Sequence, residues 1–125
     1  MIRFTKHEVL LVHQRLIDTY GGIAGYHSNV LEICLNQPFQ TYHGRDLYPN
    51  DLHKLCMLCY LIIKKHPFID GNKRVGMVLL ILGLRRHHYR FDLTNDEVIE
   101  FGLKLAANEW GIKELITRIE RAQIQ

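Results

Sequence analysis

The sequence predicts an all-α protein, because apolar residues recur at helical intervals in several segments and no segment shows the sustained alternation of a strand. Two capping-box spacings, Thr5 with Glu8 and Thr94 with Glu97, mark helix starts. The 125 residues are 47% hydrophobic and 23% charged, which is ordinary for one globular domain. We therefore expect a single compact domain over residues 1–125, built from six helices.

The first third of the chain contains two of these helices. Apolar residues recur from Val9 to Tyr20 until Gly21-Gly22 ends the pattern. A short helix over Asn29 to Leu35 should end before Gln37-Pro38. Residues 39–48 have no helical period, so a small hairpin or ordered loop is expected there.

Two apolar helices follow and should form the core. The third can be capped by Asn50 or Asp51, and it ends at Lys65 because Pro67 disfavours helical backbone in the preceding residue. Its apolar positions cover a wide face. The fourth, over Val75 to Leu84, is nearly all apolar and should be buried on most sides.

Two amphipathic helices complete the chain. The fifth follows Thr94 and places Val98, Phe101 and Leu105 on one face. The sixth follows Gly111 and repeats the pattern with four apolar residues: Ile112, Leu115, Ile116 and Ile119.

Composition excludes several classes of protein. The longest apolar runs fall short of the roughly 20 residues of a membrane span, and the start of the chain lacks a signal-peptide pattern, so we expect a cytoplasmic protein without membrane contacts. An odd count of three cysteines favours reduced thiols. Cys56 and Cys59 form a C-x-x-C, which we interpret as part of a buried helix in preference to a redox or metal site.

Basic segments leave several interpretations open. The net charge of +3 is mild and names no partner. Lys64-Lys65 and the run Arg85 to Arg90 could contact nucleic acid, contact a nucleotide or simply close a helix. The last interpretation is favoured, because cations are stabilising at helix C-termini, and we regard nucleic acid as an unlikely partner.

The polar turn between the third and fourth helices carries most of the chemistry. It reads HPFIDGNKR, from His66 to Arg74. Gly71, Asn72 and Lys73 lie at the start of the fourth helix, where unpaired N–H groups and the helix dipole attract anions. The dipole contributes only about 0.3–1 kcal/mol, so Lys73 and Arg74 are needed to hold a triphosphate.

Two further side chains complete this predicted phosphate site. Asp70 would repel phosphate unless a cation lies between them, which predicts Mg²⁺. Histidine side chains can gain and lose a proton under physiological conditions, so His66 can accept a proton from a hydroxyl. The alternative is a charged helix–helix turn in which His66 only caps the third helix.

The nine-residue turn resembles the signature of the Fic/Doc family, H-P-F-x-(D/E)-G-N-(G or K)-R between two helices. Tyr20-Gly21-Gly22, Leu47-Tyr48-Pro49 and the chain length are similar to the small Doc (death on curing) branch. The resemblance implies a compact six-helix Fic/Doc fold with a flap near Phe39 to Gly44, before the third helix, that positions a target segment.

The resemblance also implies roles for the motif residues. His66 corresponds to the catalytic base and Asp70 to the Mg²⁺ ligand. Asn72 and Arg74 match positions that bind the phosphates of ATP, and Gly71 matches the anion-hole glycine. Family enzymes generally transfer AMP from ATP to a protein hydroxyl.

Two departures from the AMP-transferring pattern favour a different reaction. Lys73 stands where those members have glycine, and Met77 stands where they have a second arginine. Lys73 is typical of Doc-type toxins, which bind ATP reversed and transfer its γ-phosphate to elongation factor Tu, inhibiting translation. We therefore predict a Doc-type kinase toxin. AMP transfer is the first alternative, and a non-catalytic translation or nucleic-acid binding module is the second.

The resemblance implies a regulator as well. Doc toxins are restrained by a Phd-like antitoxin, whose disordered segment becomes helical in a groove. Self-inhibited Fic proteins instead carry (S/T)-x-x-x-E-(G/N). Ser28 and Glu32 have this spacing, but Ile33 follows them, so we expect the antitoxin to be a separate chain.

Overall fold

The computed structural model describes residues 3–124 and confirms a six-helix, mostly α fold with one small hairpin. In chain order the elements are α1 (Lys6–Tyr20), α2 (Ser28–Asn36), the 3₁₀ turn η1 (Gln37–Phe39), β1 (Thr41–Tyr42), β2 (Arg45–Asp46), α3 (Asp51–Lys65), α4 (Asn72–Arg86), α5 (Asn95–Ala106) and α6 (Ile112–Ala122). The expected helices are all present, and the observed ends differ from the expected ones by a few residues at most.

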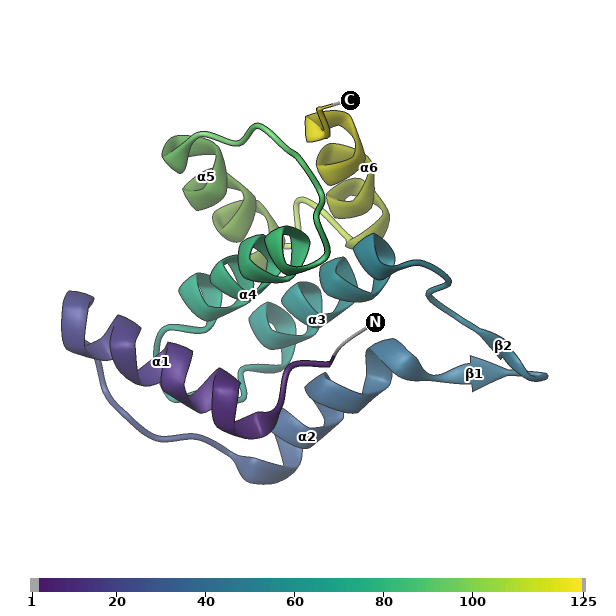
Figure 1. Cartoon of the computed structure of the whole chain (residues 1–125). Helices are drawn as coiled ribbons and strands as arrows, with labels where there is room; N and C mark the ends of the chain where they lie inside the picture. Colours follow the sequence, from purple (N-terminus) through teal and green to yellow (C-terminus); the bar gives the residue numbers. More distant parts are fainter. Residues whose placement is uncertain (1–2, 125) are drawn as a thin grey trace.

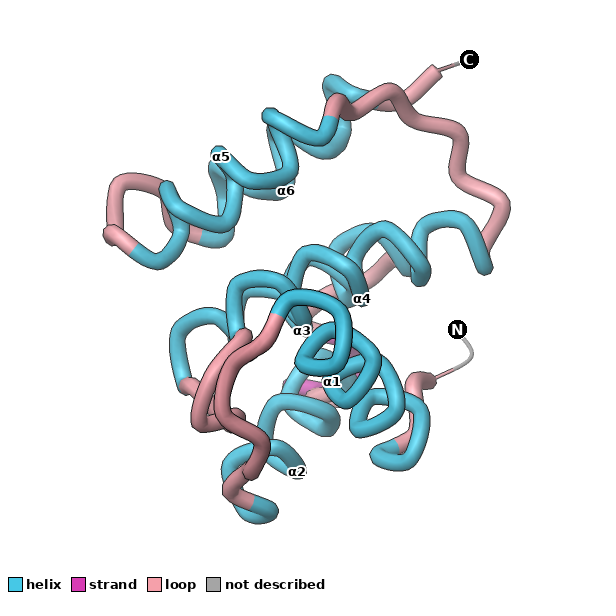
Figure 2. Tube along the Cα trace, turned by 90° about the vertical axis from the view of Figure 1, so that its left-hand side faces the viewer, coloured by secondary structure: helices cyan, strands magenta, loops and turns pink. Residues whose placement is uncertain are grey.

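Helices α3 and α4 run through the middle of the molecule. In Figures 1 and 2, α1 and α2 lie on one side of this pair, and α5 and α6 lie on the other. The hairpin projects from the body beyond α2 and α3 (Figure 1). Because α3 and α4 are covered from both sides, the loop that joins them is held by the most buried part of the chain.

Both predicted capping boxes form. The Thr5 hydroxyl accepts the Glu8 N–H at 3.1 Å, and the Glu8 carboxylate accepts the Thr5 N–H at 2.9 Å. Thr94 and Glu97 repeat the arrangement at the start of α5. Asn50, the first of the two candidates, caps α3. Each cap satisfies N–H groups that the helix itself leaves unpaired.

Glycines allow α3 and α4 to pack closely. A β-carbon on Gly83 would lie 2.2 Å from a methyl group of Leu55, and one on Gly76 would lie 3.1 Å from the carbonyl oxygen of Cys59. The glycines that interrupt the apolar run of α4 therefore lie at its contact with α3. Their role is close approach of the two helices.

The segment before α3 forms the expected hairpin, with one difference in detail. Thr41 pairs with Asp46 and Tyr42 with Arg45 in antiparallel register. Phe39, the first residue of the segment expected to form a hairpin or ordered loop, ends the 3₁₀ turn, because Pro38 has the fixed φ that such a turn needs.

One buried cation fixes the hairpin to the body. The side chain of Lys54, on α3, is 8% exposed. Its ammonium donates to the Asp46 carboxylate at 3.0 Å and to the Tyr48 carbonyl. All four strand residues are exposed, so Lys54 is the main link between this flap and the core.

Several cations of the basic segments join helices to one another. The Lys64 ammonium donates to the carbonyl oxygen of Leu105 at 3.2 Å. Arg86, in the last turn of α4, pairs with Glu8 of α1 at 2.6 Å. His87 lies 3.6 Å from the Asp51 carboxylate at the start of α3. Lys64 and Arg86 thus lie in the last turns of α3 and α4, as expected for cations that close a helix.

The three thiols are free and buried. Burial raises the pKa of Cys34 to about 11 and also raises the pKa values of Cys56 and Cys59 well above that of a free thiol. Cys59 faces Met77 of α4, with 3.6 Å between the two sulfur atoms. The C-x-x-C is therefore part of the buried face of α3, as predicted. Among the described residues, no helix is long and apolar enough to cross a membrane.

Candidate functional site

His66 ends α3 and opens the loop that carries the motif. It adopts left-handed backbone, with φ 54° and ψ 60°, and its side chain is exposed. Nδ1 lies 3.4 Å from the carbonyl oxygen of Lys64. Because a carbonyl can only accept, this contact favours the tautomer with hydrogen on Nδ1. Nε2 is then left to accept a proton from another molecule.

The Asn72 side chain is used to shape the loop. Its amide is buried, with Oδ1 accepting the Phe68 N–H at 3.0 Å and Nδ2 donating to the Phe68 carbonyl at 2.8 Å. Any contact of Asn72 with phosphate would therefore involve its backbone N–H. That group lies in the first turn of α4 with those of Lys73 and Arg74, where no intrahelical acceptor exists.

Asp70 and Gly71 form the turn into α4. Gly71 has φ 84°, a left-handed conformation that glycine adopts without strain. Its N–H donates to Asp70 Oδ1 at 2.9 Å, and Asp70 Oδ2 accepts the Ile23 N–H at 3.3 Å. The Gly71 N–H is therefore paired with the Asp70 carboxylate in this structure.

The loop between α1 and α2 runs alongside the motif loop, an arrangement that was not predicted from the sequence. The His27 N–H donates to the Pro67 carbonyl at 2.7 Å, and the Ile69 N–H donates to the Gly25 carbonyl at 3.0 Å. A β-carbon on Gly22 would lie 2.8 Å from Asp70 Oδ2. The glycine-rich composition of residues 21–25 was the only signal of this close approach.

His13 is a second feature that sequence reasoning missed. This residue of α1 is 4% exposed. Its ring stacks on Phe68, with centroids 4.0 Å apart, and its Nε2 lies 2.9 Å from the Asp70 carbonyl oxygen. A histidine on the buried face of an amphipathic helix carries no sequence signal of such a contact.

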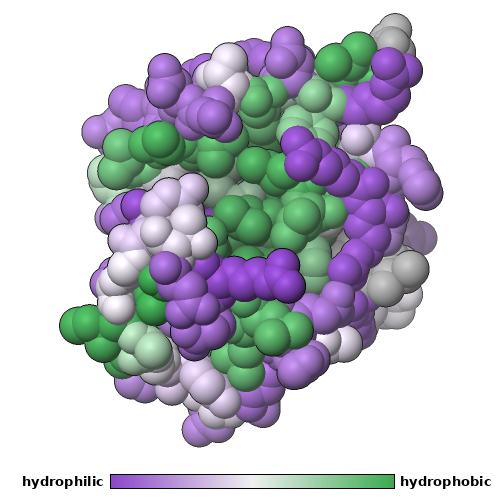
Figure 3. Space-filling view, turned by 60° about the vertical axis from the view of Figure 1, so that its left-hand side comes forward, coloured by the Kyte–Doolittle hydropathy of each residue, from purple (hydrophilic) through white to green (hydrophobic). Residues whose placement is uncertain are grey.

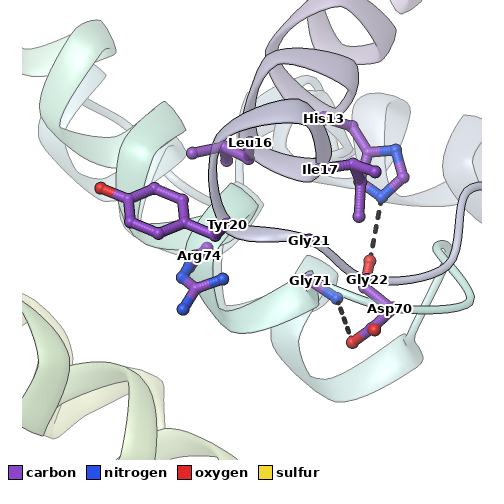
Figure 4. A pocket seen from close by; sticks show the side chains of 9 residues that line it. All are labelled: His13, Leu16, Ile17, Tyr20, Gly21, Gly22, Asp70, Gly71 and Arg74. Atoms are coloured by element: carbon purple, nitrogen blue, oxygen red, sulfur yellow. Dashed lines mark hydrogen bonds between the residues drawn. The ribbon is translucent and has the colours of Figure 1, made fainter.

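A cavity of about 180 Å³ opens where these loops meet α1 and α4 (Figure 4). The residues that line it are His13, Leu16, Ile17, Tyr20, Gly21, Gly22, Asp70, Gly71 and Arg74. The Arg74 guanidinium lies 4.2 Å from the centre of the Tyr20 ring, a cation–π contact that holds the charge at the cavity.

The cavity thus brings together three of the six predicted site residues: Asp70, Gly71 and Arg74. The other three lie in the same loop or in the first turn of α4; they are His66, Asn72 and Lys73. Lys73 is exposed, and its Cβ faces Gly102 of α5. The combination of a carboxylate, a cation and helix N–H groups is suited to an anionic ligand.

Whether these residues suit Mg²⁺ can be judged by comparing their side chains with the usual ligands of this ion. Within residues 3–124, no group of three or more His, Cys, Asp or Glu side chains could hold a metal ion. Mg²⁺ in nucleotide enzymes, however, commonly binds through one or two carboxylates together with phosphates and water. Asp70 is an exposed residue that lines the same cavity as Arg74, and its carboxylate fits this mode.

The Fic/DOC family model matches residues 3–84, more than half of the chain. This match contains α1, α2, the hairpin, α3 and the whole motif loop. The chain belongs to the Fic/DOC family. Members of this family are typically transferases, and the mostly α fold described above is consistent with the assignment. No curated protein matches the chain.

Proposed function

We propose that this Fic/DOC protein is a Doc-type toxin that transfers the γ-phosphate of ATP to a hydroxyl of an elongation factor Tu-like protein. The observation that carries the proposal is Lys73, which replaces the glycine of AMP-transferring members in an otherwise intact motif. Lys73 is exposed in the first turn of α4, next to Arg74 in the sequence, and adds a second cation to the start of this helix.

The surroundings of Met77 support the same choice. AMP-transferring members carry a second arginine at this position. Here the side chain is 2% exposed and packs on Cys59, so it offers no cation to a nucleotide. Arg74 and Lys73 are then the two cations that the motif itself offers to a nucleotide, which favours the reversed binding of ATP over the AMP-transfer orientation.

The loop supplies the groups that such a transfer needs. His66 Nε2 accepts the proton of the target hydroxyl, whose oxygen forms a bond to the γ-phosphorus. The bond from that phosphorus to the bridging oxygen of the β-phosphate breaks, and ADP leaves. Arg74, Lys73 and the N–H groups of α4 stabilise the phosphate charge. Asp70 would hold Mg²⁺, which supplies further charge neutralisation when it is bound.

We also propose that an antitoxin regulates the site in trans. The partial self-inhibitory sequence on α2 has other partners, since Lys6 donates to Ser28 at 2.6 Å and pairs with Glu32 at 3.7 Å. The contact recorded for the motif cation Arg74 is with the ring of Tyr20 on α1.

An exposed apolar surface is available for such a partner. Apolar side chains gather in a hollow on one face of the molecule (Figure 3), and α4 and α5 expose Leu82, Ile99 and Leu103. Arg85 is exposed on α4 nearby. This chemistry suits the apolar face of an antitoxin helix that also carries acidic residues.

The reaction can be tested with elongation factor Tu and ATP that is radiolabelled at the α or the γ position. We expect label to reach the protein only from the γ position, and His66→Ala to lower the rate roughly 10²–10⁴-fold. Label from the α position alone would replace the proposal by AMP transfer. Toxicity that survives His66→Ala without any transfer would favour a binding module.

The same assay tests the antitoxin. The product of a neighbouring reading frame, when added to the reaction, should abolish transfer. Persistence of full activity with every neighbouring product would contradict regulation in trans.

The proposed target is a translation factor, so we propose that the protein acts in the cytoplasm, where translation occurs.

A further inference from the structure

We infer that His13 is a positioning residue that sets the orientation of the Asp70–Gly71 peptide and, through it, of the Asp70 carboxylate. The inference concerns this chain's own loop geometry. Its consequence for Mg²⁺ and ATP rests on the proposed function. No sequence signal points to His13, which lies on α1, more than 50 positions before the motif.

The contact between α1 and the loop is well defined. His13 Nε2 lies 2.9 Å from the Asp70 carbonyl oxygen. Because the carbonyl can only accept, Nε2 carries the hydrogen and donates it. The ring is held by its stack on Phe68, with planes inclined by 15°. The His13 side is buried, with 4% of this residue exposed.

A planar peptide transmits this contact to the carboxylate. The C=O of Asp70 and the N–H of Gly71 belong to one trans peptide unit and point in opposite directions. When His13 fixes the carbonyl, it fixes the N–H too. That N–H donates to Asp70 Oδ1 at 2.9 Å. His13 therefore determines where one carboxylate oxygen is held, although it does not touch the carboxylate.

The loop between α1 and α2 holds the other oxygen. Ile23 donates its N–H to Asp70 Oδ2 at 3.3 Å, and Gly22 has φ 117° and no β-carbon to displace this oxygen. Asp70 is thus oriented from α1 through its backbone and from residues 22–23 through its side chain. Two supports on one exposed carboxylate reduce the number of orientations it can adopt before a ligand binds.

The experiment compares His13→Phe with His13→Gln. Phenylalanine keeps an aromatic ring on Phe68 and removes the donor, whereas glutamine reaches about as far as Nε2 and restores an N–H donor. His7→Phe, at an exposed position of the same helix, is the matched control. Circular dichroism and thermal unfolding establish that each variant is folded.

Hydrogen exchange of the Gly71 and Ile23 amides is the first measurement, and it needs neither ATP nor metal. We expect both amides to exchange faster in His13→Phe and to stay near wild-type rates in His13→Gln and His7→Phe. The second measurement is Mn²⁺ binding in the presence of ATP, followed by the resonance of free Mn²⁺. Its apparent affinity should fall roughly 10–100-fold in His13→Phe only.

These outcomes separate the two proposals. Unchanged exchange in His13→Phe, or equal acceleration in the phenylalanine and glutamine variants, would overturn the positioning role. Faster exchange in a protein that transfers no phosphate would retain the positioning role and remove the proposed function. If His13→Phe does not fold, nitrogen NMR of the wild-type ring decides, because a hydrogen on Nδ1 alone would overturn the inference.

Discussion

Asn72 and Lys73 are adjacent in the motif but have different surroundings. The Asn72 amide is buried and bonded to both backbone groups of Phe68, while Lys73 is exposed in the first turn of α4. Phosphate binding was predicted for both, for Asn72 from the family resemblance and for Lys73 from its charge at the start of the helix. The structure adds a separate task for Asn72, which is to close the loop on itself.

Replacing these two residues should therefore affect stability differently. Asn72→Ala leaves the buried N–H and C=O of Phe68 without partners, which should lower the free energy of unfolding by about 2–3 kcal/mol. The exposed Lys73→Ala should change it by less than about 0.5 kcal/mol. Urea unfolding followed by circular dichroism measures both. Equal stabilities would contradict a structural role for the Asn72 side chain.

The residue types of the loop predicted its chemistry, but they did not predict its contacts. The order of His66, Asp70 and Arg74 identified a base, a carboxylate and a cation, and the helix boundaries placed Gly71 at the start of α4 as expected. The contact of His13 with the Asp70 carbonyl joins positions far apart in the chain. Local periodicity contains no information about such pairs.

At the scale of elements, the motif loop depends on the loop between α1 and α2, for which the sequence predicted only that Gly21-Gly22 ends the preceding helix. Gly25 and His27 exchange backbone hydrogen bonds with Ile69 and Pro67, so the α1–α2 loop forms one wall of the site. The helices themselves were predictable because caps, apolar periods and Pro67 all agree on their limits. The pairing of two irregular loops depends on the completed helix packing.

The hairpin is another element whose position depends on one distant side chain. Strands of two residues are not stable alone. Lys54 holds them through Asp46 and the Tyr48 carbonyl. Since the hairpin stands outside the core, its opening should be a local event.

Lys54→Met tests this dependence. It removes the charge but keeps the apolar stem, and Asp46 is exposed enough to be hydrated, so global stability should change by less than about 1 kcal/mol. The Leu47 N–H, which donates to the Gln40 carbonyl at 3.0 Å, should exchange several-fold faster. Lys65→Met, at an exposed position of the same helix, should change neither quantity. Retained protection of Leu47 would show that the hairpin does not need Lys54.

For the whole molecule, the central α3–α4 pair both fills the core and holds the site. The apolar composition of α3 and α4 predicted their burial, and Figures 1 and 2 show the other helices on both sides of them. Which helices cover which side could not be predicted, because several amphipathic helices offer similar faces. Gly76 and Gly83 show how packing decides this arrangement. A β-carbon at either position would prevent the close approach of α3 to α4.

The reactivity of the three buried thiols can be used to measure how readily this core opens. Burial raises the pKa of Cys34 to about 11, so at pH 8 only roughly one thiol in a thousand is ionised at that position in the folded state. Unfolded cysteines have pKa values near 8.5. A thiol-specific disulfide reagent should therefore react slowly with the native protein, and with all three cysteines in denaturant.

The same raised pKa values make stability depend on pH. Between about pH 8.5 and 11 the unfolded thiols lose protons that the folded ones retain, so the unfolded state binds fewer protons and the free energy of unfolding falls as pH rises. Urea unfolding at pH 7.5, 8.5 and 9.5 (roughly bracketing the unfolded pKa) measures this slope. Cys34→Ala removes one of the three thiols and should make the decline shallower. A slope that is identical in this variant would show that Cys34 ionises as readily in the folded chain as in the unfolded one, and that the α2 side of the core admits water.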